Sequence, residues 1–180
     1  AAADLLSQAE HDELASSILI TDSLKFAAAV QKEMVKQLAR LKREEIARKS
    51  IETYGAIMIT RDLQEAAEIA NRIAPEHLEI MIKKPKRILP LIQNAGAIFL
   101  GEWTPEALGD YAAGPNHTLP TGGTARFSSP LGVYDFIKRS SILSFSKKGF
   151  ITLAEAVKTI ADAEGLEAHG NTIRLRQKYK

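Results

Sequence analysis

Two consecutive side chains, Glu76 and His77, could carry out acid–base chemistry. They follow Pro75, which ends a predicted helix, and they precede a predicted strand. A carboxylate and an imidazole at such a joint are suited to proton transfer near neutral pH. Consecutive side chains of an extended chain point apart, so each would serve a different proton. The simpler alternative is an exposed polar joint without a chemical role.

The run 108–127, LGDYAAGPNHTLPTGGTARF, is the second candidate region. Its glycines and prolines predict a long loop rather than a regular helix or a central strand. It holds Asp110 and His117 on a backbone that glycine allows to approach a ligand closely. Long loops in compact domains are usually functional or disordered, and the apolar residues within this run argue against disorder. A surface Ω-loop in which Asp110 only forms a turn remains the alternative.

Further nitrogen and oxygen donors for a metal ion lie near the two ends of the chain. Gln8 and His11 are three residues apart on a predicted helix and share one face, although such a pair is more often a solvated edge. His169 follows the last predicted helix, where an imidazole that bonds free helix carbonyls is the alternative. Together, Gln8, His11, Asp110 and His169 would form a nitrogen–oxygen shell that zinc or a similar divalent ion would accept. Only the fold can bring these separate segments together.

The composition is that of an ordinary globular protein and excludes several classes of function. Hydrophobic residues make up 45% and charged residues 26%, and the formal charge of +2 gives no case for binding nucleic acid or a membrane surface. No apolar run approaches the length of a membrane span, and no signal peptide is visible. There is no cysteine, so any metal site must use nitrogen and oxygen ligands.

Several familiar motifs are absent from the sequence. It has no glycine fingerprint for dinucleotides or phosphates, no H-E-x-x-H and no nucleophile elbow. The chain begins without methionine and inside a helical pattern, from which we expect a processed chain or a fragment.

Apolar strands alternate with amphipathic helices, a pattern that predicts parallel βαβ units with right-handed crossovers. The predicted strands cover 17–21, 54–60, 78–82, 97–100 and 142–146. The predicted helices cover 4–15, 22–41, 44–52, 63–73, 86–93 and 153–163, with a turn-helix at 132–139. Thr21 or Asp22 is expected to cap the second helix and Thr60 the fourth. The second strand is apolar throughout, as in a sheet covered on both faces.

The predicted fold class is therefore α/β. Residues 1–130 are expected to form an incomplete, Rossmann-like domain with a parallel sheet, which carries most of the metal and acid–base residues. Residues 131–180 are expected to form a small C-terminal helical tail that reaches a partner subunit.

Four segments resemble successive motifs of the histidinol dehydrogenase family, in that family's order: SQAEHD, APEHLE, GAIFLGEWTPEALGDYAAGPNHTLPTGGTARFSSPLGVYDF and AEGLEAHGN. The resemblance covers essentially the whole chain, and the long third motif is specific. It corresponds to the C-terminal part of the family sequence. The N-terminal half of the family sequence, with most of its dinucleotide-binding residues and a substrate-contacting serine, is therefore expected to lie outside this chain.

The resemblance implies an NAD-dependent, zinc-requiring oxidoreductase of histidine biosynthesis, which converts L-histidinol to L-histidine through the aldehyde. It implies that His77 takes the alcohol proton in the first oxidation and assists the second, while Glu76 activates water for attack on the aldehyde. The implied zinc ligands are Gln8, His11, Asp110 and His169. The implied substrate contacts are the same four residues with His77 and Glu164, and zinc would hold the imidazole and amine of the substrate. His117 and the cofactor-binding residues receive no assignment.

The family is a homodimer with intertwined subunits, whose tail supplies the residues matching Glu164 and His169 to the partner's active site. The expected partners are therefore L-histidinol, a second copy of the chain and the N-terminal half of the enzyme. The expected location is the cytoplasm, or the plastid in a plant source. One alternative is a metal- and substrate-binding fragment that is inactive alone, because the chain shows no complete site for a hydride acceptor. The other is a zinc-dependent α/β hydrolase with Glu76 as its base.

Overall fold

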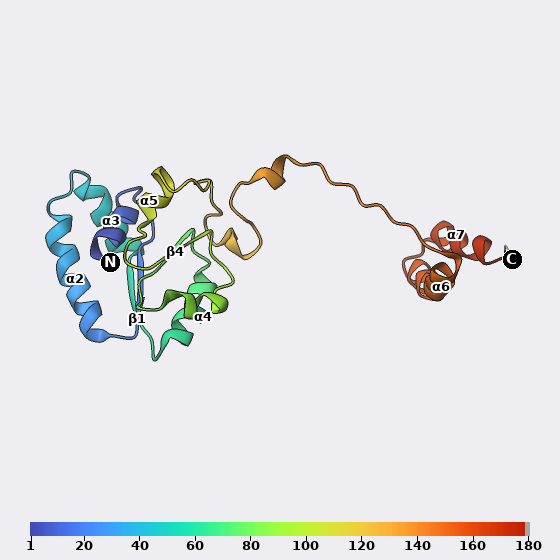
Figure 1. Ribbon diagram of the computed structural model, residues 1–180, viewed down its shortest axis with the longest axis horizontal. Coiled ribbons are helices and arrows are strands. Elements are labelled where there is room, and N and C mark those ends of the chain that lie inside the picture. The colour runs from blue at the N-terminus through green and yellow to red at the C-terminus, as the bar shows by residue number, and fades with distance from the viewer. Residues whose placement is uncertain (179–180) are drawn as a thin grey trace. The chain divides into compact units, whose positions relative to one another are not determined.

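The computed structural model describes residues 1–178. These residues divide into two units, with the boundary along the chain between Phe136 and Ile137 (Figure 1). Unit 1, Ala1–Phe136, contains four strands: β1 (Ile18–Thr21), β2 (Ala56–Ile59), β3 (His77–Ile80) and β4 (Ala97–Leu100). Its α-helices are α1 (Ala2–Ala9), α2 (Leu24–Leu38), α3 (Glu44–Tyr54), α4 (Leu63–Ile73) and α5 (Glu106–Tyr111). Unit 2 contains α6 (Lys147–Ala163) and α7 (Glu167–Lys178). No helix in the described range is both long and apolar enough to cross a bilayer.

The strands of unit 1 form two parallel pairs, so the predicted α/β class is confirmed. β1 pairs with β2 from Ile18 opposite Ala56, and β3 pairs with β4 from His77 opposite Ala97. Each pair is a separate two-stranded sheet in the described part of the chain. Parallel strands need a long crossover connection. Here α2 and α3 connect β1 to β2, and short 3₁₀ turns connect β3 to β4.

Two apolar clusters hold these elements. Leu6 and Ala9 of α1 pack with Leu38 of α2 and Ala47 of α3, which joins the three N-terminal helices. In Figure 1 these helices lie together on one side of unit 1, with α4 across β1 from them. The second cluster joins Ala67 of α4 to Ile80 of β3 and to Ile88 in the connection before β4. Burial of these apolar stripes, rather than helix propensity, is what stabilises such short elements.

Three predicted helices have different bounds in the structure. α1 ends at Ala9 instead of continuing to residue 15, because the Asp12 carboxylate accepts the Leu14 N–H at 2.8 Å and forms a local turn. The helix predicted at 86–93 is wrong: the segment forms two 3₁₀ turns, Pro85–Arg87 and Leu89–Leu91. A proline inside this segment removes an N–H donor and clashes with an α-helical backbone. The last helix begins earlier than predicted, at Lys147, where the Ser146 side chain accepts the Gly149 N–H.

Several finer expectations were also wrong. Ser23 and Asp62 cap α2 and α4, one or two residues after the predicted caps, and each accepts the N–H three residues later. The start of the 108–127 run is helical, because α5 extends to Tyr111. No strand forms at 142–146 within residues 1–178, and the described part of unit 2 contains no other strand with which this segment could pair. The face of β2 that carries Ile57 and Ile59 is exposed rather than covered, at 39% and 48%.

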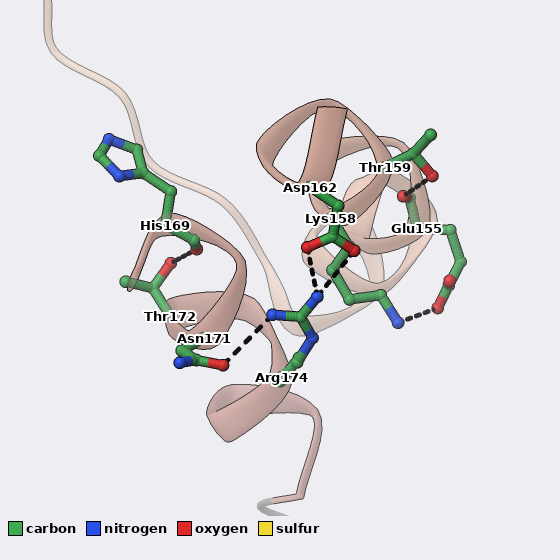
Figure 2. Close-up of polar contacts among 8 residues, drawn as sticks. All are labelled: Glu155, Lys158, Thr159, Asp162, His169, Asn171, Thr172 and Arg174. Atoms are coloured by element: carbon green, nitrogen blue, oxygen red, sulfur yellow. Dashed lines mark hydrogen bonds and ion pairs between the residues drawn. The ribbon is translucent and has the colours of Figure 1, made fainter. Parts of the chain in front are cut away.

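Unit 2 is a helical pair rather than the single helix and polar stretch that the sequence suggested. Ala154 and Ala161 are buried where α6 packs on α7. Figure 2 shows Arg174 of α7 reaching Asp162 of α6 with two bonds at 2.5 and 2.8 Å, and Asn171 at 3.2 Å. One guanidinium nitrogen of Arg174, Nη2, donates to both carboxylate oxygens of Asp162, and this charge-assisted contact links the two helices. The last two residues of the predicted tail lie outside the described range.

Candidate active and metal-binding site

His77 occupies the first position of β3, opposite Ala97 of β4. Its ring lies 5.9 Å from the ring of Phe99, centroid to centroid, at a tilted angle of 53°. Both ring nitrogens are buried, and neither has a hydrogen-bond partner among residues 1–178. Buried polar atoms without partners are uncommon and call for an explanation such as a bound group or a catalytic role.

Helix α5 places two carboxylates opposite this imidazole. The Nε2 atom of His77 lies 3.9 Å from Oε1 of Glu106 and 4.0 Å from Oδ1 of Asp110. The two acids are four residues apart, so they share one face of the helix. The donor atoms of all three side chains lie within 4.8 Å of one another, an arrangement that could hold a metal ion. Nitrogen and carboxylate oxygen are donors that zinc accepts, so the donor chemistry fits a divalent metal.

Two contacts hold α5 at this position. Gly109 is buried against Phe99, and a Cβ atom added to it would lie only 2.5 Å from the Phe99 ring. Pro105 occupies the N-cap position before α5 and provides no side-chain cap; instead, the Glu106 N–H donates to the Glu79 carboxylate at 2.8 Å. Glu79 therefore serves as the cap that helix N-termini require, although it comes from β3.

Burial and neighbouring charge raise the pKa of two glutamates at the site, Glu106 and Glu79. Burial raises the pKa of Glu106, and the charge of Asp110 and a hydrogen bond with it raise this pKa further, while His11 opposes them. Burial is also the main cause that raises the pKa of Glu79, against the bond from the Glu106 N–H. Two carboxyls in one small space disfavour double ionisation unless a cation is present.

An apolar cavity of about 660 Å³ borders the site. Gln8 of α1 lines it together with Glu76, His77 and Glu106. The effect of the His11 charge on Glu106 indicates that this residue also lies near the carboxylates. The fold thus brings the predicted Gln8, His11, Glu76, His77 and Asp110 to one region of unit 1, although they come from separate segments.

The remaining predicted residues lie elsewhere. Glu164 and His169 belong to unit 2, and both are exposed. Figure 2 shows the His169 imidazole pointing away from the Arg174 cluster, while the His169 carbonyl accepts the Thr172 hydroxyl. Within unit 1, His117 is exposed in the run after α5.

Two residues of the site were missed from the sequence, Glu106 and Glu79. Glu106 stands four residues before Asp110, a spacing that marks a shared helical face, but the surrounding glycines predicted a loop. Glu79 stands two residues after His77, the spacing of one face of a strand. Both spacings are present in the sequence, but each indicates a shared face only when the segment is known to be a helix or a strand, respectively.

The fold and site define a class: an α/β protein with paired parallel strands, whose acid–base and metal-donor side chains meet beside an apolar cavity. Residues 1–177 match the family model for histidinol dehydrogenase, so the chain belongs to that family. It is 62% identical to the histidinol dehydrogenase of Geobacter sulfurreducens over 177 residues and 57% identical to that of Aquifex aeolicus over 176 residues.

These matches cover 98% of this chain but only 41% of each of the two relatives. Among solved structures, a crystal structure of histidinol dehydrogenase from Elizabethkingia anophelis matches with a TM-score of 0.80 at 36% identity. That match also covers 98% of this chain and 41% of the other. The chain therefore spans less than half the length of the relatives it matches.

Proposed function

We propose that this chain is the C-terminal part of an NAD-dependent histidinol dehydrogenase, the oxidoreductase that completes histidine biosynthesis. The observation that carries the proposal is the buried His77 imidazole, which lies about 4 Å from two carboxylates in a chain of this family. The family favours this activity over the zinc-dependent hydrolase. Because the chain spans 41% of its relatives, we infer that it supplies the metal and acid–base residues and requires the remaining part for activity.

His77 is the proposed base that takes the hydroxyl proton of L-histidinol in the first oxidation and assists the second. The ring stands against Phe99, and this contact and the β3–β4 pairing restrict its motion. Orientation of a base in this way lowers the barrier for proton transfer. Glu76, which precedes His77 in the sequence, is the proposed group that orients and deprotonates the water that adds to the aldehyde. NAD accepts the hydride in both steps when it is bound.

The proposed metal ligands are Gln8, His11, Asp110 and His169, with zinc as the metal. The chemistry that zinc supplies when bound is orientation of the imidazole and amine groups of the substrate. The same four residues, His77 and Glu164 are the proposed substrate contacts. Glu106 extends this set, since its carboxylate lies as close to His77 as that of Asp110 does.

Assembly is the second part of the proposal. A homodimer with tail exchange would bring Glu164 and His169 of one chain to the site of its partner, which gives the exposed His169 imidazole a role. Residues 131–180 are the proposed exchanged tail, and residues 1–130 the Rossmann-like domain. The cytoplasm, or the plastid in a plant source, is the proposed location.

The testing experiment measures NADH formation from L-histidinol with Zn²⁺, first with this chain and then after addition of the N-terminal part of the enzyme. Activity that appears only after addition supports the proposal. Absence of activity with both parts present and zinc bound would overturn it. Within the complex, Glu76→Gln should slow the aldehyde-to-acid step more than the first oxidation, whereas equal slowing of both steps would contradict its role.

Metal binding is tested separately. His11→Ala and Asp110→Ala should each remove bound zinc while the circular dichroism spectrum stays unchanged. Tight retention of zinc in both variants would contradict the ligand assignment. His117→Ala is the matched control: this imidazole is exposed in the run after α5 and carries no ligand assignment.

A further inference from the structure

Residues 10–17 connect α1 to β1 and carry His11; we call them the 10–17 loop. The loop contains turns but neither a helix nor a strand. The Ala15 N–H donates to the Asp12 carbonyl at 3.0 Å, and the Leu14 N–H donates to the Asp12 carboxylate. His11 itself is exposed, so burial of its side chain does not hold it in place. The position of this proposed metal ligand therefore depends on the contacts that hold the loop.

Two exposed side chains of α3 reach the loop. The Lys49 ammonium pairs with the Glu13 carboxylate, and the Arg43 guanidinium donates to the His11 carbonyl at 3.4 Å. Water competes for both contacts, and exposed ion pairs and hydrogen bonds contribute little to stability. These two contacts alone do not fix the loop.

A third contact from α3 is made by a buried side chain. Ser50 is 0% exposed, and its hydroxyl donates to the Ala15 carbonyl at 2.8 Å. Serine is a poorer helix former than alanine, and within a helix its hydroxyl often bonds to a carbonyl one turn back. Here the hydroxyl reaches a separate segment of the chain instead. Loss of this donor would leave the Ala15 carbonyl unsatisfied where water has limited access, so this bond holds the loop more firmly than the exposed contacts do.

The same face of α3 also supports α1, which carries the proposed ligand Gln8. Ala9 of α1 and Ala47 of α3 are both fully buried and belong to one apolar cluster. Ala47 lies three residues before Ser50, so the two share a face of α3. Figure 1 shows α1 and α3 side by side. One helix face therefore carries both the apolar contact with α1 and the hydroxyl that holds the loop.

We propose that Ser50 is a positioning residue for the metal site, because its bond to Ala15 holds the 10–17 loop so that His11 lies near the carboxylates of α5. The influence of His11 on the pKa of Glu106 agrees with this placement. The inference rests on the proposed ligand role of His11. It goes beyond that role, since Ser50 acts through the loop backbone and not on the metal.

Zinc affinity tests the proposal without any measurement of activity. The zinc dissociation constant is measured by chelator competition on this chain mixed with the N-terminal part of the enzyme. Ser50→Ala should raise the constant by about tenfold or more, as loss of a group that orients a metal ligand typically does. With Co²⁺ in place of zinc, the visible absorption spectrum of this variant should change, because it reports the ligands and their geometry. An unchanged dissociation constant would overturn the proposal.

Two further variants separate positioning from a general loss of stability. Ser50→Thr keeps the hydroxyl but adds a methyl group at a fully buried position, so it should lower the unfolding midpoint and retain most of the zinc affinity. Val30→Ala shortens a side chain of α2 that is 5% exposed, and it should lower the midpoint without a change in zinc affinity. If zinc affinity falls in proportion to the midpoint in all three variants, Ser50 has only a structural role and the proposal is overturned.

Ser16→Ala is the matched control within the loop. The Ser16 hydroxyl also donates to a backbone carbonyl of α3, that of Tyr54 at 3.0 Å, but Ser16 is exposed. Water replaces a partner that is lost at an exposed position, so zinc affinity should stay unchanged. Equal weakening by Ser16→Ala and Ser50→Ala would overturn the role of the buried hydroxyl.

The inference and the proposed function fail in different ways. Tight zinc binding by both the unmodified chain and Ser50→Ala would overturn the inference and leave the ligand assignment standing. Zinc binding that weakens in Ser50→Ala, in a complex without dehydrogenase activity, would support the inference while the proposed oxidoreductase function fails. Retention of zinc in His11→Ala would overturn the ligand role of His11 and this inference with it.

Discussion

Gly109→Ala tests how closely α5 must approach β4 for the site to form. The added Cβ atom would lie 2.5 Å from Cε1 and 3.1 Å from Cζ of Phe99. Ordinary carbon–carbon contacts are about 3.5–4.0 Å, so the helix or the ring must move by roughly 1 Å. Because Glu106 and Asp110 lie on this helix and the Phe99 ring contacts His77, either movement changes the distances within the site.

The expected magnitudes differ for stability and for metal binding. Overpacking costs about 1–3 kcal/mol, and replacement of glycine by alanine inside a helix returns about 1 kcal/mol. The free energy of unfolding should therefore fall by only about 0–2 kcal/mol. Displacement of a metal ligand through a supporting contact typically weakens metal affinity by about 10–100-fold, so zinc binding should suffer more than folding.

The assay combines thermal unfolding with measurement of the zinc dissociation constant. That constant is measured by chelator competition on this chain mixed with the N-terminal part of the enzyme. Gly132→Ala is the control, since its Cβ would meet nothing closer than 3.6 Å and should leave zinc affinity unchanged. Phe99→Leu in the Gly109→Ala background removes the clashing ring edge and should recover part of the affinity. Unchanged zinc affinity in Gly109→Ala, or no recovery in the double variant, would refute the reasoning.

Three further predictions concern Glu79 and the helical pair of unit 2. Glu79→Ala removes the cap of α5 and should lower the free energy of unfolding by about 1 kcal/mol in urea unfolding, whereas Glu79→Gln keeps an acceptor oxygen and should not. Because the pKa of Glu79 is raised on folding, its contribution to stability is present below the ordinary glutamate pKa of 4.5 and is lost as pH rises through the raised value. Glu79→Gln should therefore flatten the decrease in stability across that pH range. Arg174→Ala should separate α7 from α6 at a cost of about 0.5–1 kcal/mol, because the pair with Asp162 is partly exposed.

Each of these predictions has a contrary outcome. Equal loss of stability in Glu79→Ala and Glu79→Gln would argue against the capping bond. An unchanged pH profile of Glu79→Gln, followed in the metal-free protein, would argue against a raised pKa. Arg176→Ala is the control for unit 2, because among residues 1–178 the Arg176 side chain bonds to the Thr172 carbonyl, one turn back on its own helix. Loss of stability as large as in Arg174→Ala would contradict the bridging role.

The sequence predicted the α/β class and the four strands of unit 1 to within two residues at each end. Apolar runs bounded by turn residues, with amphipathic helices between them, carry this information locally. Prediction of secondary structure from the sequence failed where a single local feature overrides the hydrophobic periodicity. Asp12 ends α1 early, and the proline-interrupted segment before β4 forms 3₁₀ turns. The apolar run at 142–146 did not form a strand, since strand formation depends on a neighbouring edge that no local pattern specifies.

By itself the sequence determined the family and the residue types available for chemistry, because motifs are read along one dimension. Only the tertiary structure decided which donors meet: it placed Asp110 4.0 Å from His77 and added Glu106, which no motif analysis had singled out. The reason is that these contacts depend on the packing of Gly109 on Phe99 and on the bond from Glu106 to Glu79, both between separate elements.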